Sequence, residues 1–86
     1  MPEQLIGTVT HYFSKAGVAA IKITAGELHV GDQIHVVGHT SDFSQNIDSM
    51  EIERAPIEIA KPGDEIGVKV IEHAREHDNV YRVLPD

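Results

Sequence analysis

Two Gly-Asp pairs, each followed by alternating hydrophobic and polar residues, place the strongest constraint on the fold of this chain. Gly31-Asp32 precedes residues 33–37, and Gly63-Asp64 precedes residues 65–71. Glycine accepts the positive φ angle that a tight turn needs, and an aspartate side chain bonds nearby backbone amides. A hydrophobic residue at every second position is typical of a strand with one buried face. The two blocks predict an all-β fold with tight turns.

Strand-favouring residues recur along the rest of the chain. They are concentrated in six segments, residues 5–13, 18–23, 33–37, 46–53, 65–71 and 80–84. No window has the 3.6-residue apolar period of a helix. Closing short strands into a barrel removes exposed sheet edges. We therefore predict one domain, residues 1–86, folded as a single six-stranded, mostly antiparallel closed β-barrel.

Local irregularities refine this prediction. Ile47 and Met50 can both face inward only if a bulge near Asp48-Ser49 resets the alternation. Ala55-Pro56 is expected to end that strand, and Pro62-Gly63 predicts a type II turn. Gly67, inside a strand, indicates a close approach of two backbones.

The charge balance limits the classes of partner. The chain has 7 basic and 14 acidic residues, a net charge of −7. Proteins that hold nucleic acid or anionic lipid non-specifically need a surplus of Lys and Arg, so neither partner is expected. The chain has no cysteine, and no apolar run approaches the ~18 residues of a membrane span. A cytoplasmic location is the default expectation.

Six histidines make this surface sensitive to pH. Full protonation would change the net charge from −7 to −1 (−7 + 6). His73 and His77 have the i, i+4 spacing that binds zinc on a helix, so they are the candidate metal ligands. The favoured alternative is a solvated loop, because a structural zinc site needs about four ligands. The carboxylates of Glu51 and Glu53 are interpreted as a solvated outer face.

A possible binding surface comes from four residues on strands. Lys22 and Lys69 are expected to point outward, and Tyr81 and Arg82 are adjacent on the last strand. Arg, Lys and Tyr side chains can stack on or clamp the end of an RNA or a partner. The favoured alternative is scattered solubilising charge. The chain shows no nucleophile with a partner base, so no catalysis and no cofactor are expected.

The two Gly-Asp blocks also carry a family resemblance. The residues that match it are Gly26, Leu28, Gly31, Asp32, Ile34, Val36 and Gly38 in the first block, then Ile47, Ser49, Met50, Ala60, Pro62, Gly63, Asp64, Ile66 and Gly67. Over roughly residues 6–83, the chain resembles the β-barrel second domain of translational GTPases of the elongation factor Tu type. Through Asp42-Phe43 and residues 80–82 it is similar to the C-terminal barrel of the collagenase-like peptidase family, several of whose members are associated with RNA modification.

The resemblance implies binding rather than chemistry. The matched residues are turn and core residues, and the Gly-x-x-x-x-Gly-Lys-Ser/Thr loop that holds GTP phosphates is absent from the sequence, so GTP binding is not expected. In elongation factor Tu this barrel contacts the aminoacyl end of tRNA. We expect a stand-alone, non-catalytic binding module of translation or RNA-modification machinery, whose partner is a protein or a structured RNA such as tRNA or a ribosome component. The alternatives are a protein–protein adaptor or detached accessory domain of a larger enzyme, and a histidine-based metal-binding protein.

Overall fold

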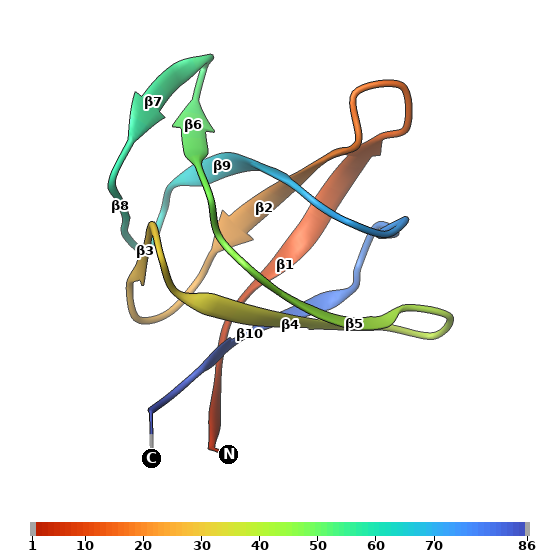
Figure 1. Cartoon of the computed structure of the whole chain (residues 1–86), viewed down its shortest axis with the longest axis horizontal. Coiled ribbons are helices and arrows are strands. Elements are labelled where there is room, and N and C mark those ends of the chain that lie inside the picture. The colour runs from red at the N-terminus through yellow and green to blue at the C-terminus, as the bar shows by residue number, and fades with distance from the viewer. Residues whose placement is uncertain (1, 86) are drawn as a thin grey trace.

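Residues 2–85, which the computed structural model describes, form ten strands joined by turns and loops, with no helix (Figure 1). The strands are β1 (Glu3–Phe13), β2 (Val18–Ile23), β3 (Leu28–His29), β4 (Gln33–Val37), β5 (Asp42–Asn46), β6 (Met50–Ile52), β7 (Ala55–Ile57), β8 (Ile59–Ala60), β9 (Glu65–Lys69) and β10 (Asn79–Val83). The all-β prediction is confirmed, and the predicted segments 18–23 and 33–37 match β2 and β4 to the residue. In residues 2–85, no helix is long and apolar enough to cross a membrane.

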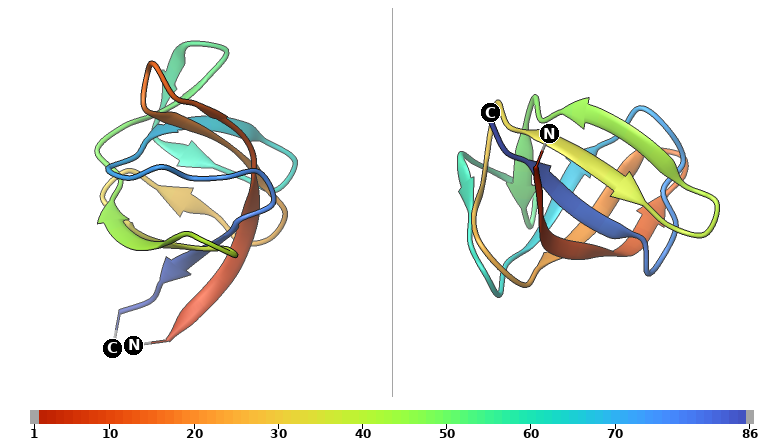
Figure 2. Two further views of the ribbon diagram at one scale, coloured as in Figure 1. Left: turned by 90° about the vertical axis from the view of Figure 1, so that its right-hand side faces the viewer. Right: turned by 90° about the horizontal axis from the view of Figure 1, so that it is seen from below.

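Eight of the strands form one antiparallel sheet in the order β5-β4-β10-β1-β2-β9-β6-β7, and β3 pairs with β8. The sheet curls around a common interior (Figure 2). The long strand β1 makes this curvature possible, because its register shifts between Leu5 and Gly7 and again between Val9 and His11. Such bulges bend a strand and increase its twist. The prediction of mostly antiparallel pairing is confirmed.

The predicted closed six-stranded barrel is not what the structure contains. Within residues 2–85, backbone pairing stops at β5 on one side of the sheet and at β7 on the other. The expected strand over residues 46–53 contains only the last residue of β5 and the whole of β6, with a break between them. Ile47 and Met50 are both buried, at 1% and 2% exposure. The alternation is therefore reset at Asp48-Ser49, where the sequence predicted a bulge, but the reset interrupts the strand completely.

The chain after this break also differs from expectation. Ala55-Pro56 was predicted to end a strand, whereas Ala55 begins β7, which turns back on β6. Proline has no amide hydrogen and is tolerated in a sheet only where no ladder bond is needed. Pro56 meets this condition because β7 is the last strand of the sheet.

One type of turn occurs three times. In each, the first residue donates its amide hydrogen to an Asp carboxylate three positions later, and that Asp donates its own amide hydrogen back. The turns are His29 to Asp32 (2.8 and 3.0 Å), Lys61 to Asp64 (2.9 and 3.0 Å) and Arg75 to Asp78 (2.9 and 3.1 Å). The type II turn predicted at Pro62-Gly63 is confirmed by Gly63 at φ 96°. His77 takes the glycine position in the third turn, at φ 74°.

The core is a single aliphatic cluster inside the curled sheet. It combines residues from both Gly-Asp blocks and the first two strands, including Ile6, Ile21, Leu28, Ile34 and Ile66, each at most 1% exposed. Phe43 on β5 joins this core and is 6% exposed. Because aliphatic side chains fill the inner face of the sheet, a binding partner can reach only its outer face.

Candidate binding groove

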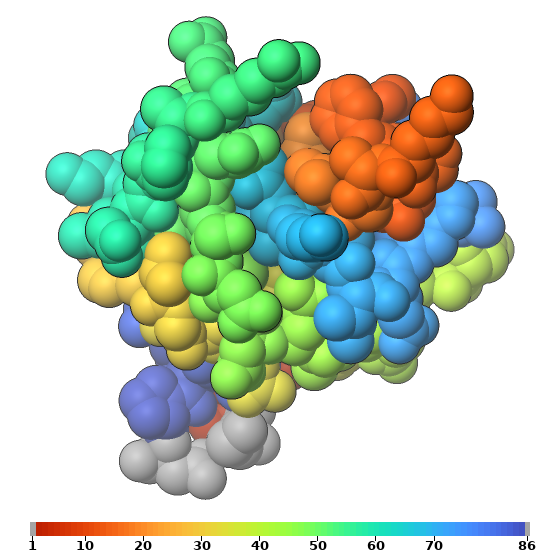
Figure 3. Space-filling view, turned by 45° about the horizontal axis from the view of Figure 1, so that its top comes forward, coloured from red at the N-terminus to blue at the C-terminus, as the bar shows by residue number. Residues whose placement is uncertain are grey.

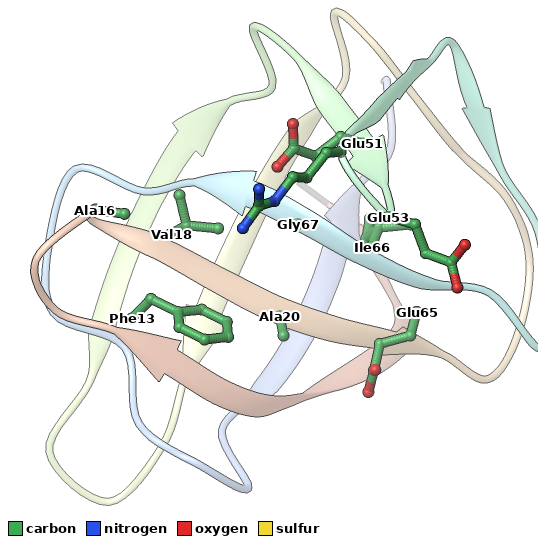
Figure 4. A pocket seen from close by; sticks show the side chains of 10 residues that line it. Phe13, Ala16, Val18, Ala20, Glu51, Glu53, Glu65, Ile66 and Gly67 are labelled. Carbon is green, nitrogen blue, oxygen red and sulfur yellow. The ribbon is translucent and has the colours of Figure 1, made fainter.

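A groove of about 410 Å³ lies on the outer face of β2 and β9. Val18 and Ala20 on β2 and Gly67 on β9 form its floor, and Phe13 at the end of β1 stands at one side (Figure 4). The Phe13 side chain is 51% exposed, which is unusual for a large aromatic residue. The groove therefore offers apolar surface to a partner.

Strand alternation explains why the floor is shallow and apolar. Ala19 and Ile21 point into the core, so the intervening residue Ala20 points out, where it pairs with Gly67 across the β2–β9 ladder. A Cβ atom added to Gly67 would lie 3.4 Å from Glu51 Cγ, which is an ordinary contact. The close backbone approach predicted at Gly67 is therefore wrong. The missing side chain instead keeps the floor of the groove open.

The rim of the groove is charged. Glu51 and Glu53 come from β6 and the turn after it, Glu65 comes from β9, and Arg54 is the single cation among the lining residues. Glu65 accepts a 2.9 Å hydrogen bond from Thr10. Among residues 2–85, the ion pairs involve neither Glu51, Glu53 nor Arg54. The two carboxylates that the sequence assigned to a solvated face therefore border an apolar surface.

The turn that carries two of these charges has an unusual backbone. Ile52 pairs with Ala55, so Glu53 and Arg54 form a two-residue hairpin turn, with φ angles of 49° and 68°. Positive φ at both positions defines a type I′ turn, for which Asn-Gly is strongly preferred. A non-glycine residue in this region costs about 1 kcal/mol or more. Two groove-lining residues are thus held in a conformation that their side chains do not favour.

The hollow is visible on the surface of the molecule. In Figure 3, the hairpin between β1 and β2 (orange) and the hairpin of β6 and β7 (green) stand on either side of β9 (blue). The two ends of the described chain lie elsewhere, where the Leu84 amide donates to Pro2 O at 2.9 Å. Figure 1 shows these ends at the bottom of the molecule and both hairpins at the top. The groove and the two ends of the described chain therefore lie at opposite ends of the molecule.

The structure does not bring the four predicted binding residues together. Lys22 and Lys69 lie at opposite ends of the β2–β9 ladder, and Lys22 Nζ donates to the Gly63 carbonyl at 3.1 Å. Tyr81 and Arg82 are neighbours on β10 and so point to opposite faces. Arg82 Nε lies 3.2 Å from the Asp32 carboxylate, at the end of the core. A role for these residues in binding stays a prediction.

The two candidate metal ligands lie in an exposed loop, as the favoured alternative predicted. His73 and His77 belong to the loop between β9 and β10, so the helical i, i+4 geometry assumed for them is wrong. The His73 ring stacks on Tyr12, with centroids 4.3 Å apart, and His77 has positive φ in its turn. Within residues 2–85, no group of three or more His, Asp or Glu side chains is placed to hold a metal ion.

His35 makes a contact that sequence reasoning did not foresee. Its Nε2 lies 2.6 Å from an Asp42 carboxylate oxygen, and its Nδ1 lies 2.8 Å from Glu3. The hydrogen bond to Asp42 raises the pKa of His35, partial burial opposes this, and Glu3 adds to the increase. When both ring nitrogens carry a proton, His35 links β1, β4 and β5. Glu3 is 32 positions away along the chain, so no local pattern could have identified the pair.

Comparison with known proteins places the domain in a family. The family model described as elongation factor Tu domain 2 matches residues 16–76, a segment that contains every groove-lining residue except Phe13. The chain belongs to the elongation factor Tu domain 2 family. The resemblance stated from the two Gly-Asp blocks is thereby confirmed.

Relatives with similar sequences are longer proteins. A collagenase of Porphyromonas gingivalis is 37% identical over 78 residues, which cover 90% of this chain and 22% of the collagenase. An uncharacterized protease of Methanocaldococcus jannaschii is 38% identical over 77 residues, or 88% of this chain and 19% of the protease. The chain thus spans about a fifth of the length of these relatives.

A solved structure supports the same relationship at the level of the fold. The C-terminal domain of a Geobacillus thermoleovorans protein described as a U32 peptidase superimposes with a TM-score of 0.87. The match covers 94% of this chain and 93% of that domain, at 19% sequence identity. The predicted similarity to the C-terminal domain of collagenase-like peptidases is therefore confirmed.

Proposed function

We propose that this elongation factor Tu domain 2 family member is a non-catalytic accessory domain that binds a polypeptide for a larger enzyme of the U32 peptidase type. The groove on β2 and β9 is the observation that carries this proposal, because it joins apolar floor residues to unpaired charges on an accessible face. The relatives support the accessory role, since the matching region is only 19–22% of each protease or collagenase.

The charge distribution favours a polypeptide over RNA. Three of the four charged groove residues are carboxylates, and the whole chain carries a net charge of −7. Such a surface repels phosphates, whereas RNA affinity depends on cations that replace the counterions of the backbone. A polypeptide can instead place apolar side chains on the floor and backbone amides against the rim.

The association with translation or RNA modification is a second candidate. It rests on the family to which the chain belongs, and its partner would be a tRNA or a ribosome component. One local feature favours it, because Arg54 and the Phe13 ring could stack on or clamp a nucleotide. A role in translation or RNA modification would also agree with the cytoplasmic location expected from the sequence.

Binding assays with the purified chain test the leading proposal. Immobilised gelatin and casein should bind saturably and remain uncleaved, because the chain supplies a binding surface without catalysis. The variant A20Y should bind less, since a tyrosine on the floor fills the groove. The variant S44Y is the matched control, because Ser44 is an exposed strand residue away from the groove. Cleavage by the chain alone, or binding of tRNA in place of both polypeptides, would overturn the proposal.

A further inference from the structure

We infer that the groove selects polypeptide segments in which one apolar side chain is flanked by Lys or Arg. The inference rests on the proposed function and names the class of partner. It assigns the apolar side chain to the floor of the groove and the flanking cations to its rim.

The floor determines the need for an apolar side chain. Val18, Ala20 and Gly67 expose no polar side-chain atom, and Phe13 adds an aromatic wall that is half exposed. Covering such apolar surface removes it from water and stabilises a complex. The apolar floor consists of only three small residues. One apolar side chain with its flanking residues, and not a whole apolar helix face, is the matching occupant.

The rim determines the need for cations. Glu51, Glu53 and Glu65 contribute three negative charges against one positive charge from Arg54. Glu51 and Glu53 take part in none of the ion pairs found in the described part of the chain. A Lys or Arg beside the apolar side chain would meet these carboxylates and could also contact the Phe13 ring face. An acidic neighbour would instead meet repulsion.

The strained turn provides independent support. Glu53 and Arg54 occupy positive φ, where Asn-Gly would relieve the backbone strain. Backbone strain of this kind clusters at ligand-binding sites, where the side chain is needed despite its conformational cost. Here both strained residues line the groove. A role in binding explains why charged residues occupy a turn that favours Asn and Gly.

Three matched synthetic peptides test the selection directly by fluorescence anisotropy. Each carries a central leucine in a Gly/Ser background, flanked by lysines, by serines or by glutamates. The lysine peptide should bind most tightly and the glutamate peptide least, and added salt should weaken the lysine peptide most, because salt screens exposed charges. A short RNA ending in CCA is the fourth probe.

Variants of the rim link the selection to the groove. The double variant E51Q/E53Q should weaken the lysine peptide by about fivefold, as expected for the loss of two exposed ion pairs, and leave the serine peptide unchanged. The control E58Q/E72Q removes the same charge from exposed residues outside the groove, and it should change neither affinity. Both double variants keep the size of each side chain, so folding is preserved.

The outcomes separate the inference from the proposed function. Equal binding of all three peptides, or equal effects of the two double variants, would overturn the charge selection and leave polypeptide binding intact. Binding of the RNA alone, weakened by A20Y, would overturn both. Failure of every probe to bind would overturn both as well.

Discussion

Gln45 accepts a 2.7 Å hydrogen bond from the backbone amide of Ile71. Its Nε2 atom donates to the carbonyl of Lys69 at 2.9 Å, so one side chain replaces two bonds of a backbone ladder. Gln45 lies on β5, the edge of the eight-stranded sheet, and Lys69 ends β9. A side-chain bridge therefore connects two strands that no backbone pairing joins.

This bridge should stabilise the curled sheet measurably. The substitution Q45L removes both bonds and should lower the free energy of unfolding by about 1–2 kcal/mol, as expected for bonds that are only partly shielded from water. Urea titration measures the loss. Hydrogen exchange at the Ile71 amide should accelerate. Unchanged exchange there would show that the Gln45 side chain does not protect this amide.

The turn between β6 and β7 should be more stable with a different sequence. The double variant E53N/R54G places the preferred residues at both positive φ positions and should raise the free energy of unfolding by about 1–2 kcal/mol. Thermal unfolding measures the change. The same variant removes one carboxylate and one cation from the rim, so its affinity for the lysine peptide should change little. A less stable variant would contradict the assignment of strain.

The turn from Arg75 to Asp78, the third of the three similar turns, allows a parallel test. His77 sits at φ 74°, the position that Gly31 and Gly63 hold in the other two turns. The variant H77G should be more stable by about 1 kcal/mol, because glycine accepts this conformation without steric cost. H73G provides the contrast, since His73 stacks on Tyr12 and its loss should destabilise the chain. Differential scanning calorimetry compares the two.

Stability should depend on pH through His35. Its pKa is raised in the folded state by Asp42 and Glu3, so the folded state binds its proton more tightly than the unfolded state. The stabilisation is therefore fully present below the unfolded pKa of about 6.5 and is lost as the pH rises through the higher folded pKa. Urea unfolding across this range should show the decrease. In H35Q the decrease should be smaller, and an identical profile would exclude His35 as its source.

The sequence predicted those features whose causes are local. Gly31 and Gly63 predict their turns because no other residue so readily adopts positive φ. The alternation of hydrophobic and polar residues around Ile21 and Ile34 predicts β2 and β4. Ile47 and Met50 show the limit of this reasoning. Their broken alternation predicted a bulge, but only the tertiary structure decides that the chain leaves one edge of the sheet and re-enters at the other.

The groove could not be predicted because its parts come from distant segments. Phe13, Glu53 and Gly67 come together only after β6 has paired with β9 and β7 has folded back on β6. The turn at Glu53-Arg54 also lacks the glycine or asparagine that signals a type I′ hairpin. A single clue was present, since Gly67 in the middle of a strand marks a position without a side chain. That clue was interpreted as a close backbone approach.

An NMR titration of the isotope-labelled chain with the lysine-flanked leucine peptide tests whether the groove binds polypeptide. We predict that amide shifts change at Ala20, Gly67 and Glu53, saturate with peptide, and stay unchanged with the glutamate-flanked peptide. Shift changes confined to Lys69, Tyr81 and Arg82, or changes caused only by the CCA RNA, would contradict a polypeptide-binding groove.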